Sequence, residues 1–361
     1  MSADTPHIDR PEPRLHEPRG YKRVATEEAF LPNELYELYV RLIERGSVPD
    51  PGFQSLIGYY LMSGSERARN VSERLRDLGE RRLADMDAAG IDMQILGLTS
   101  PGVQVLPKAD AISLASLAND QLSEAVRKYP TRFVGLAAIA PQDPERAAQE
   151  IERGVRKLGL RGVIVNSHTQ GEYLDAPKYA PIFAAAEALN VPLYLHPNTP
   201  SPQMIQPFLE AGLDGAIYGF GVETGLHALR IITSGVLDRY PRLKLVLGHL
   251  GEALPFWMYR LDYMHRGTVT SRRYDFMKPL QKPISAYLRE NIFVTTSGMA
   301  WQPAISFCQA TLGMDHVLYA MDYPYQYVPD EVRAQDELPL GAADKRKFFQ
   351  SNAEHVFGIR A

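Results

Sequence analysis

Short apolar runs alternate with helix-like segments along almost the whole chain. Eight runs have the length and composition of β-strands, near residues 23–28, 91–97, 133–139, 161–166, 191–196, 243–248, 291–296 and 316–321. Helix-like segments separate or follow them, at 33–45, 65–89, 109–129, 144–157, 176–189, 222–234, 251–265, 301–311 and 342–357. Such alternation is typical of a parallel sheet made of βα units. Eight units in one chain favour a barrel over an open sheet.

Local signals support this assignment of helices and strands. Asp143 followed by Pro144 is typical of a helix start, because the aspartate caps backbone N–H groups and proline suits the first helical position. Gly90 and Gly159 stand where helices should end just before a strand. The Pro- and Gly-rich stretch 49–58 predicts a loop, and 65–89 predicts one charged helix.

The predicted fold is α/β, a distorted (β/α)8 barrel of the TIM type with inserted helical or lid segments, in a single domain over residues 21–361. The insertions lie near 31–64, 197–221 and 266–290. The first two should cover the active face of the barrel, as a lid or as dimer contacts. Residues 1–20 contain prolines and charges but no apolar stretch, which predicts a flexible tail and not a secretion signal.

Composition and charge narrow the classes of partner. The formal net charge of −4 gives no reason to expect nucleic acid or an anionic membrane as partner. No apolar run reaches the roughly 18 residues of a membrane span, so we expect a cytoplasmic protein. The single cysteine, Cys308, excludes an intrachain disulfide and a cysteine-based metal site. Its apolar surroundings favour an inert core thiol.

Four polar residues each follow an apolar run: Glu27, His196, His249 and Asp322. Because the chemistry of a barrel gathers at the carboxyl ends of its strands, we expect them to lie together. Taken singly, each also has a structural interpretation, as a solvated acid or a packed histidine at a strand end. Glu27 and Glu28 are neighbours in a strand, so only one of them can face the barrel mouth.

Glu27, His196 and Asp322 make a donor set for one divalent metal ion. A carboxylate such as Asp322 is costly to bury without a partner, and a metal ion supplies one. Two carboxylates and one imidazole leave positions open for water or substrate, and they suit Mn²⁺ or Mg²⁺, with Zn²⁺ as an alternative. His249 and Glu252 are three residues apart, so they can face each other on a first helical turn, where the carboxylate would raise the basicity of the imidazole.

An anionic substrate would also require an arginine. Arg67 follows the Gly-rich segment of the first insertion. Arg260 lies about three helical turns beyond His249, so it would point away from the mouth of its own barrel. It could serve the site of a dimer partner, or pair with Asp262. A third strand-end histidine, His168, is expected to orient its loop and not to bind metal.

Several motifs, in the same order along the chain, resemble those of one family. They are Ala25-Thr26-Glu27-Glu28-Ala29-Phe30, Leu195-His196-Pro197, Gly219-Phe220-Gly221-Val222-Glu223-Thr224-Gly225, Gly248-His249-Leu250-Gly251-Glu252, Tyr259-Arg260-Leu261-Asp262 and Met321-Asp322-Tyr323-Pro324-Tyr325. They are similar to the non-oxidative aromatic acid decarboxylases of the amidohydrolase superfamily, in the aminocarboxymuconate semialdehyde decarboxylase branch. The stretches Ser55–Tyr60 and Ser65–Arg67 are most similar to the 5-carboxyvanillate decarboxylases. The resemblance spans about residues 21–358.

The resemblance implies roles for individual residues. Glu27, His196 and Asp322 would hold one divalent ion, usually manganese, with no organic cofactor. His249 and Glu252 would form a pair that handles a proton or supports the metal shell, and Asp322 would carry a catalytic proton. Residues that line or order the substrate pocket would be Tyr59, Arg67, Phe220, Arg260 and Tyr325. Glu27 and Ala29 stand where many superfamily members carry His-x-His, which argues against the two-metal hydrolases.

The expected substrate is a benzoate with a hydroxyl ortho to the carboxylate, 5-carboxyvanillate above all, and the expected products are vanillate and CO₂. Direct loss of CO₂ would leave an unstable aryl anion, so Asp322 should first protonate the ring carbon. γ-Resorcylate and 2,3-dihydroxybenzoate are alternative substrates. A metal-dependent hydrolase, a hydratase or lactonase, and a non-catalytic barrel are the rival functions. The resemblance also implies the catabolism of aromatic compounds such as those from lignin, and a homodimer or dimer of dimers.

Overall fold

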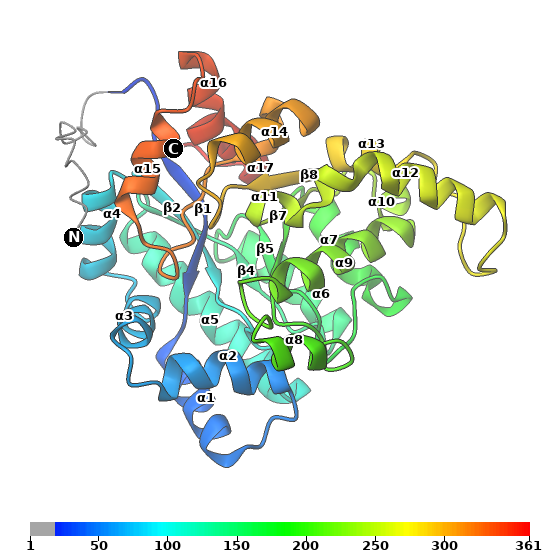
Figure 1. Ribbon diagram of the computed structural model, residues 1–361. Helices are drawn as coiled ribbons and strands as arrows, with labels where there is room; N and C mark the ends of the chain where they lie inside the picture. Colours follow the sequence, from blue (N-terminus) through cyan, green and yellow to red (C-terminus); the bar gives the residue numbers. More distant parts are fainter. Residues whose placement is uncertain (1–18) are drawn as a thin grey trace, which may run out of the picture.

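The computed structural model describes residues 19–361, so the tail predicted for residues 1–20 lies almost entirely outside the described part of the chain. Its strands are all parallel (Figure 1). One sheet contains β1 (Val24–Phe30), β2 (Met93–Leu98) and β3 (Phe133–Gly135) in that order. The other contains β4 (Ala137–Ala138), β5 (Val163–Asn166), β6 (Leu193–His196), β7 (Leu245–Leu247), β8 (Ile292–Thr295) and β9 (Val317–Leu318), each paired with the next.

Single backbone hydrogen bonds link the two sheets into one barrel. β3 and β4 are one strand position interrupted at Leu136, whose N–H donates to Leu96 O at 2.9 Å. On the other side no strand ladder joins β9 to β1 within residues 19–361, but Thr26 N–H donates to Tyr319 O at 3.1 Å and Ala29 N–H to Tyr323 O at 2.7 Å. Counting β3 and β4 together, the eight predicted strand positions and the (β/α)8 class are confirmed.

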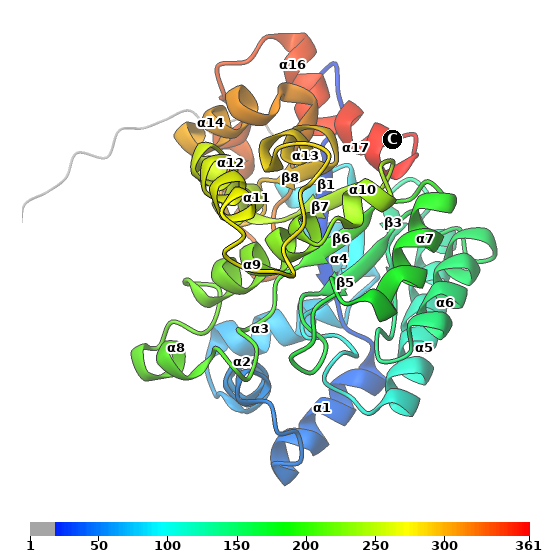
Figure 2. The same ribbon diagram turned by 90° about the vertical axis from the view of Figure 1, so that its right-hand side faces the viewer.

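Most predicted helices are also confirmed. The outer layer includes α5 (Lys108–Lys128), α6 (Pro144–Arg156) and α7 (Ala180–Ala188), which cover one side of the strands in Figure 2. It continues with α9 (Gly219–Thr233), α12 (Leu254–Thr270), α13 (Ile284–Glu290) and α14 (Gln302–Leu312), and ends with α16 (Ala342–Arg346), a π-helical turn and α17 (Asn352–Phe357). Asp143 caps α6 by accepting from Arg146 N–H, and Gly90 and Gly159 take positive φ angles of 67° and 75° after α4 (Glu80–Ala89) and α6, as predicted.

Two local predictions between β1 and β2 are wrong. The expected loop at 49–58 is largely a helix, α2 (Pro51–Met62), because Asp50 caps it by accepting from Phe53 N–H at 2.9 Å and Pro51 takes the first position. The expected single helix at 65–89 is two, α3 (Glu66–Leu75) and α4 (Glu80–Ala89). The break arises where Asp77 accepts from Gly79 N–H and Arg82 N–H, which turns the chain between them.

The insertions take different positions in the fold. α1 (Asn33–Arg45) and α2 from the first, and α8 (Gln206–Ala211) from the second, lie at the end of the barrel to which the β1 arrow points (Figures 1 and 2). The third region consists of the end of α12, a loop over residues 271–283 and α13. The carboxyl ends of the strands are therefore the ones that the first two insertions approach.

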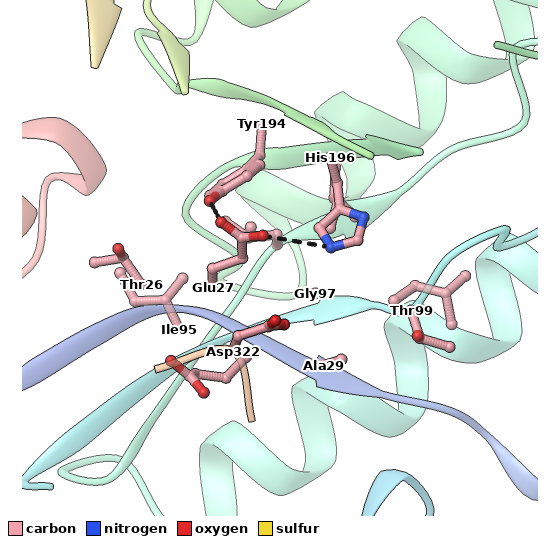
Figure 3. A pocket seen from close by; sticks show the side chains of 13 residues that line it. Thr26, Glu27, Ala29, Ile95, Gly97, Thr99, Tyr194, His196 and Asp322 are labelled. Carbon is pink, nitrogen blue, oxygen red and sulfur yellow. Dashed lines mark hydrogen bonds and ion pairs between the residues drawn. The ribbon is translucent and has the colours of Figure 1, made fainter. Parts of the chain in front are cut away.

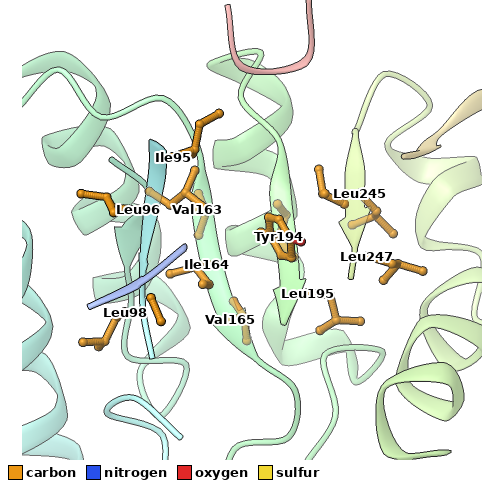
Figure 4. Packing of buried hydrophobic residues seen from close by; sticks show 14 of the residues in the cluster. Ile95, Leu96, Leu98, Val163, Ile164, Val165, Tyr194, Leu195, Leu245 and Leu247 are labelled. Carbon is orange, nitrogen blue, oxygen red and sulfur yellow. The ribbon is translucent and has the colours of Figure 1, made fainter. Parts of the chain in front are cut away.

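The core lies between the strands and the outer helices. Figure 4 shows aliphatic side chains of β5, β6 and β7 packed together, including Val163, Leu195 and Leu245, which are all fully buried. Burial of such side chains is the main stabilising contribution in a fold of this kind. Cys308 is buried in α14, and burial raises the pKa of its thiol to about 11, which agrees with an inert core residue. Within residues 19–361, no helix combines the length and the apolar character that crossing a membrane requires.

Candidate active site

Glu27 lines a buried pocket from the middle of β1, which continues to Phe30, and not from the end of that strand as expected. Its Oε2 accepts hydrogen bonds from Thr295 Oγ1 at 2.8 Å and from the Tyr194 hydroxyl. Its Oε1 is buried and has no hydrogen-bond partner among the described residues. Oε1 lies 3.5 Å from His196 Nε2 and 3.9 Å from His249 Nε2. Figure 3 shows the Glu27 carboxylate between Tyr194 and His196.

The tautomer of His196 follows from its other nitrogen. Nδ1 lies 2.9 Å from the carbonyl oxygen of Pro197, which can only accept, so Nδ1 carries the proton. Burial lowers the pKa of His196, although the Glu27 carboxylate acts in the opposite direction, so the ring is neutral. The lone pair of Nε2 therefore faces the carboxylate oxygen of Glu27 with no proton between them. These two hydrogen-bond acceptors repel each other, and a cation bound there would stabilise both.

Asp322 lines the same pocket from the segment after β9. Its backbone is left-handed, with φ at 73°. Glu28 holds the peptides on either side, since its carboxylate accepts from Met321 N–H at 3.0 Å and from Tyr323 N–H at 2.7 Å. Burial raises the pKa of Asp322 to about 8, against the opposing charge of His249. The two adjacent glutamates thus have different roles: Glu27 faces His196 and His249, and Glu28 supports the Asp322 segment.

His249 and Glu252 form the predicted pair, with Nδ1 and Oε1 2.8 Å apart. Burial by itself would lower the pKa of His249, but the charges of Glu252 and Glu27 and the Glu252 hydrogen bond outweigh it and raise the pKa to about 10. The expectation of a regular helical turn is wrong. Residues 249–252 all have positive φ angles, and Gly251 packs so closely on β8 that a Cβ there would lie 2.8 Å from Val294.

The donor set fits a divalent ion, although the described residues do not form a closed shell. Within residues 19–361 no three His, Cys, Asp or Glu side chains converge as tightly as a complete metal site does. Glu27 and His196 are already aimed at one another, with an orphaned oxygen and a free imidazole lone pair. Gly248 packs against the same carboxylate, and a Cβ there would lie 2.6 Å from Glu27 Oε2. Asp322 supplies a second carboxylate in the same pocket.

A wider groove opens from this pocket toward α9 and α12. Phe220, His249, Glu252 and Asp322 line it, together with Trp257, Leu261 and Gln326. Gln326 Nε2 donates to both carboxylate oxygens of Glu331 at 2.9 and 2.8 Å, so its carbonyl oxygen is the end left for the groove. Three of the predicted catalytic residues and one predicted substrate-binding residue therefore share one cavity.

Three further predicted substrate residues meet at α2 and α3. The Tyr325 hydroxyl contacts Thr99 Oγ1 at 2.5 Å, and Arg67 Nη2 donates to the Tyr325 carbonyl at 3.0 Å. Tyr59 packs edge-on against Tyr60, which packs in the same way on Tyr325. The first insertion thus reaches the Asp322 segment through aromatic contacts.

Arg260 is the predicted residue that does not reach the site of its own chain. It is exposed on α12, as its distance along the helix from His249 indicated. The alternative pairing with Asp262 is not formed, because Asp262 accepts from Ser285 N–H at 2.9 Å and from Ser285 Oγ at 2.6 Å. His168 contacts two loops, which agrees with the expected role in orienting its loop: its Nε2 bonds to Thr199 O at 3.1 Å and its Nδ1 accepts from Gly171 N–H.

Sequence reasoning missed Tyr194, Thr295 and the supporting role of Glu28. Tyr194 stands two residues before His196, and alternate residues of a strand share a face. The spacing therefore predicts that Tyr194 faces the same pocket as His196. Thr295 ends its strand as a neutral hydroxyl, which gave no signal of its own.

Comparisons with known proteins place the chain in a family. A sequence model of the amidohydrolase family matches residues 47–359. A 5-carboxyvanillate decarboxylase structure from Novosphingobium aromaticivorans, complexed with manganese and 4-hydroxy-3-methoxy-5-nitrobenzoic acid, is 58% identical, with a TM-score of 0.93 over 94% of this chain and 97% of that one.

Two further relatives are more distant. A γ-resorcylate decarboxylase from a Polaromonas species is 37% identical over 80% of this chain and 90% of its own length. A 2,6-dihydroxybenzoate decarboxylase structure complexed with 2,6-dihydroxybenzoate is 32% identical, with a TM-score of 0.82 over 94% of this chain and 100% of that one. The family match and these similarities show that the chain belongs to the amidohydrolase family.

Proposed function

We propose that the protein is a metal-dependent carboxy-lyase that removes one carboxyl group from 5-carboxyvanillate and releases vanillate and CO₂. The observation that carries this proposal is the pairing of Glu27 Oε1 with the His196 lone pair, beside Asp322, in one buried pocket. The 58% identity to a decarboxylase of that substrate supports the choice of substrate. γ-Resorcylate remains the second candidate, because relatives that act on it are 36–37% identical.

Glu27, His196 and Asp322 are the proposed ligands of the metal ion, and Mn²⁺ is the proposed ion because relatives were solved with it. Zn²⁺ is the alternative. A divalent ion bound there would supply positive charge to the carboxylate and the ortho oxygen of the substrate. Two attachment points would also fix the orientation of the ring, which lowers the entropic part of the barrier.

The chain's own residues would handle the proton. Asp322 would take the phenol proton and deliver it to the ring carbon that bears the carboxylate. The C–C bond to the carboxylate then breaks, CO₂ leaves, and the electron pair returns to the ring. His249, held by Glu252 at 2.8 Å, would face the substrate from the groove side of the pocket as a positive charge. Arg67, Tyr59 and Tyr325 would order the substrate from the α2 and α3 side.

A second copy of the chain would complete the site. Ile217, Phe256, Tyr259, Tyr263 and Trp301 are all more than half exposed, and together they give α12 and its surroundings an apolar outer surface. Exposed apolar surface of this kind marks an interface. In a homodimer or dimer of dimers, the exposed Arg260 would then be available to the groove of the partner, which needs a cation for an anionic substrate. We propose the cytoplasm as its location and the breakdown of lignin-derived aromatic acids as its role.

An aromatic acid panel followed by ultraviolet spectra tests the proposal. 5-Carboxyvanillate should be converted to vanillate and CO₂, while 2,6- and 2,3-dihydroxybenzoate should react more slowly. Treatment with a chelator should abolish the reaction, and added Mn²⁺ should restore it. Turnover of esters, lactones or amides without decarboxylation would favour the hydrolase, hydratase or lactonase alternatives and would refute the proposal.

A further inference from the structure

The two oxygens of the Glu27 carboxylate have opposite environments. Oε2 accepts from Thr295 Oγ1 at 2.8 Å and from the Tyr194 hydroxyl, while Oε1 accepts from none of the described residues. The residue is 6% exposed, so water offers Oε1 little compensation. A buried carboxylate oxygen without a partner is costly, whereas its twin is fully used. The arrangement therefore leaves Oε1 of Glu27 available to bind a ligand, while Oε2 is held by its two donors.

The two hydroxyls that hold Oε2 are themselves fixed. Thr295 Oγ1 accepts from Ser297 N–H at 3.4 Å, which leaves its own hydrogen for Glu27. Tyr194 Oη lies 3.2 Å from Thr295 Oγ1, so the two donors approach Oε2 side by side. Both residues come from strands of the barrel wall, β6 and β8, and are 1% exposed or less.

A third contact prevents the carboxylate from turning. A Cβ on Gly248 would lie 2.6 Å from Glu27 Oε2 and 2.8 Å from Oε1, so the backbone of Gly248 closely backs the whole group. Rotation of the carboxylate away from this orientation would break both hydroxyl bonds. His196 Nε2 and His249 Nε2 lie 3.5 and 3.9 Å from Oε1.

We propose that Tyr194 and Thr295 are positioning residues that restrict Glu27 to binding the metal ion through Oε1 only. This inference rests on the proposed metal site. A carboxylate that binds through both oxygens takes two positions around an ion, and one that binds through a single oxygen takes one. By occupying Oε2, the two hydroxyls would keep a position free, so that a substrate can bind through both its carboxylate and its ortho oxygen.

Mn²⁺ binding to the full-length protein tests this directly, followed by the electron paramagnetic resonance signal of free Mn²⁺. Thr295→Val removes the hydroxyl but keeps the shape, and Tyr194→Phe removes only the phenol oxygen. Each should weaken Mn²⁺ binding about 10- to 100-fold, the usual effect of losing a group that orients a ligand. Thr295→Ser restores the donor and should bind Mn²⁺ nearly as the wild type does.

Tyr179→Phe is the matched control, because the Tyr179 hydroxyl also donates to a glutamate, Glu172, at 3.0 Å, away from the site. It should leave Mn²⁺ affinity unchanged. Equal affinity of Thr295→Val and wild type would overturn the inference, and so would Thr295→Ser being as weak as Thr295→Val. If the wild type itself fails to bind Mn²⁺, the proposed metal site is wrong and not only the role of these two residues.

A second measurement addresses the free position on the ion. At saturating Mn²⁺, 2-hydroxybenzoate should bind more tightly than benzoate to the wild type, because only the former can chelate. This advantage should shrink in Thr295→Val and Tyr194→Phe, where Glu27 can use both oxygens. An unchanged advantage in both variants would contradict the single-oxygen role.

Discussion

The floor of the site and its rim are built on different principles. On the floor, Glu27, His196 and Asp322 are held by backbone and side-chain hydrogen bonds from the barrel strands and their ends. At the rim, Phe220 stands on α9 and Arg260 on α12, and α12 carries exposed aromatic side chains. Because the floor residues already have hydrogen-bond partners in the same chain, the floor lacks only its metal ion. A rim with an apolar outer surface remains incomplete until something covers it.

The floor and the rim differ in which functions a single chain can complete. Proton transfer and metal binding require positions fixed to a fraction of an ångström, and the barrel wall supplies them. Recognition of the distal part of a substrate tolerates a contribution from a second subunit. Changes to the floor should therefore mainly alter kcat or metal content, and changes to the rim should mainly alter KM and assembly.

Asp322→Asn should have the largest effect. The amide cannot shuttle the proton to the ring carbon, so kcat should fall by about 1000-fold or more, within the usual range for loss of a general acid. Vanillate formation and the thermal unfolding midpoint are the measurements, and the midpoint should change little. Near-normal turnover would show that another group carries the proton.

Gly248→Ala should come next. Gly248 has an ordinary extended backbone, so the added methyl acts only by its contact with Glu27 at 2.6 Å. Displacing the carboxylate should lower kcat/KM about 100-fold, as small misplacements in active sites do, and should reduce bound Mn²⁺. Gly58→Ala is the control, since nothing lies within 4 Å of a Cβ there. An equal loss in both variants would mean that the effect is not local to Glu27.

Glu28→Gln should lower kcat less. The amide can still accept one of the two backbone hydrogen bonds from Met321 and Tyr323, but its NH₂ group opposes the other N–H. Leaving a buried donor unsatisfied costs about 1–3 kcal/mol, which should appear both as a lower unfolding midpoint and as a decrease in kcat of about 10-fold. Glu34→Gln, on the exposed side of α1, should change neither quantity.

Arg260→Ala should have the smallest effect on chemistry and a different signature. We expect KM for the aromatic acid to rise about 10-fold, the scale of one lost charged hydrogen bond, with Mn²⁺ content unchanged. Mixing Arg260→Ala with an inactive Asp322→Asn chain should restore activity in part if the arginine acts across subunits. Failure of the mixture to recover activity would place Arg260 outside the partner's site, and Arg266→Ala on the same helix serves as the surface control.

The sequence alone determined the barrel and the chemical composition of its mouth. Eight apolar runs separated by helical periodicity admit few other folds, and polar residues at strand ends must gather at one face because parallel strands all point the same way. Glu27, His196 and Asp322 could therefore be grouped across almost 300 residues. The start of α6 could also be predicted, because the capping residue Asp143 and the N–H group that it accepts from lie within four residues of each other.

The use of each oxygen and nitrogen in the site depends on contacts between distant parts of the chain. The helix at 51–62 depends on its cap at Asp50 and its packing, which overrode the Gly and Pro content of the segment. The left-handed turn at 249–252 and the support of Asp322 by Glu28 join groups that sequence periodicity cannot relate. The same holds for Tyr194 and Thr295, which lie 101 positions apart and meet on one oxygen of Glu27 because their strands, β6 and β8, flank β7 in the barrel wall.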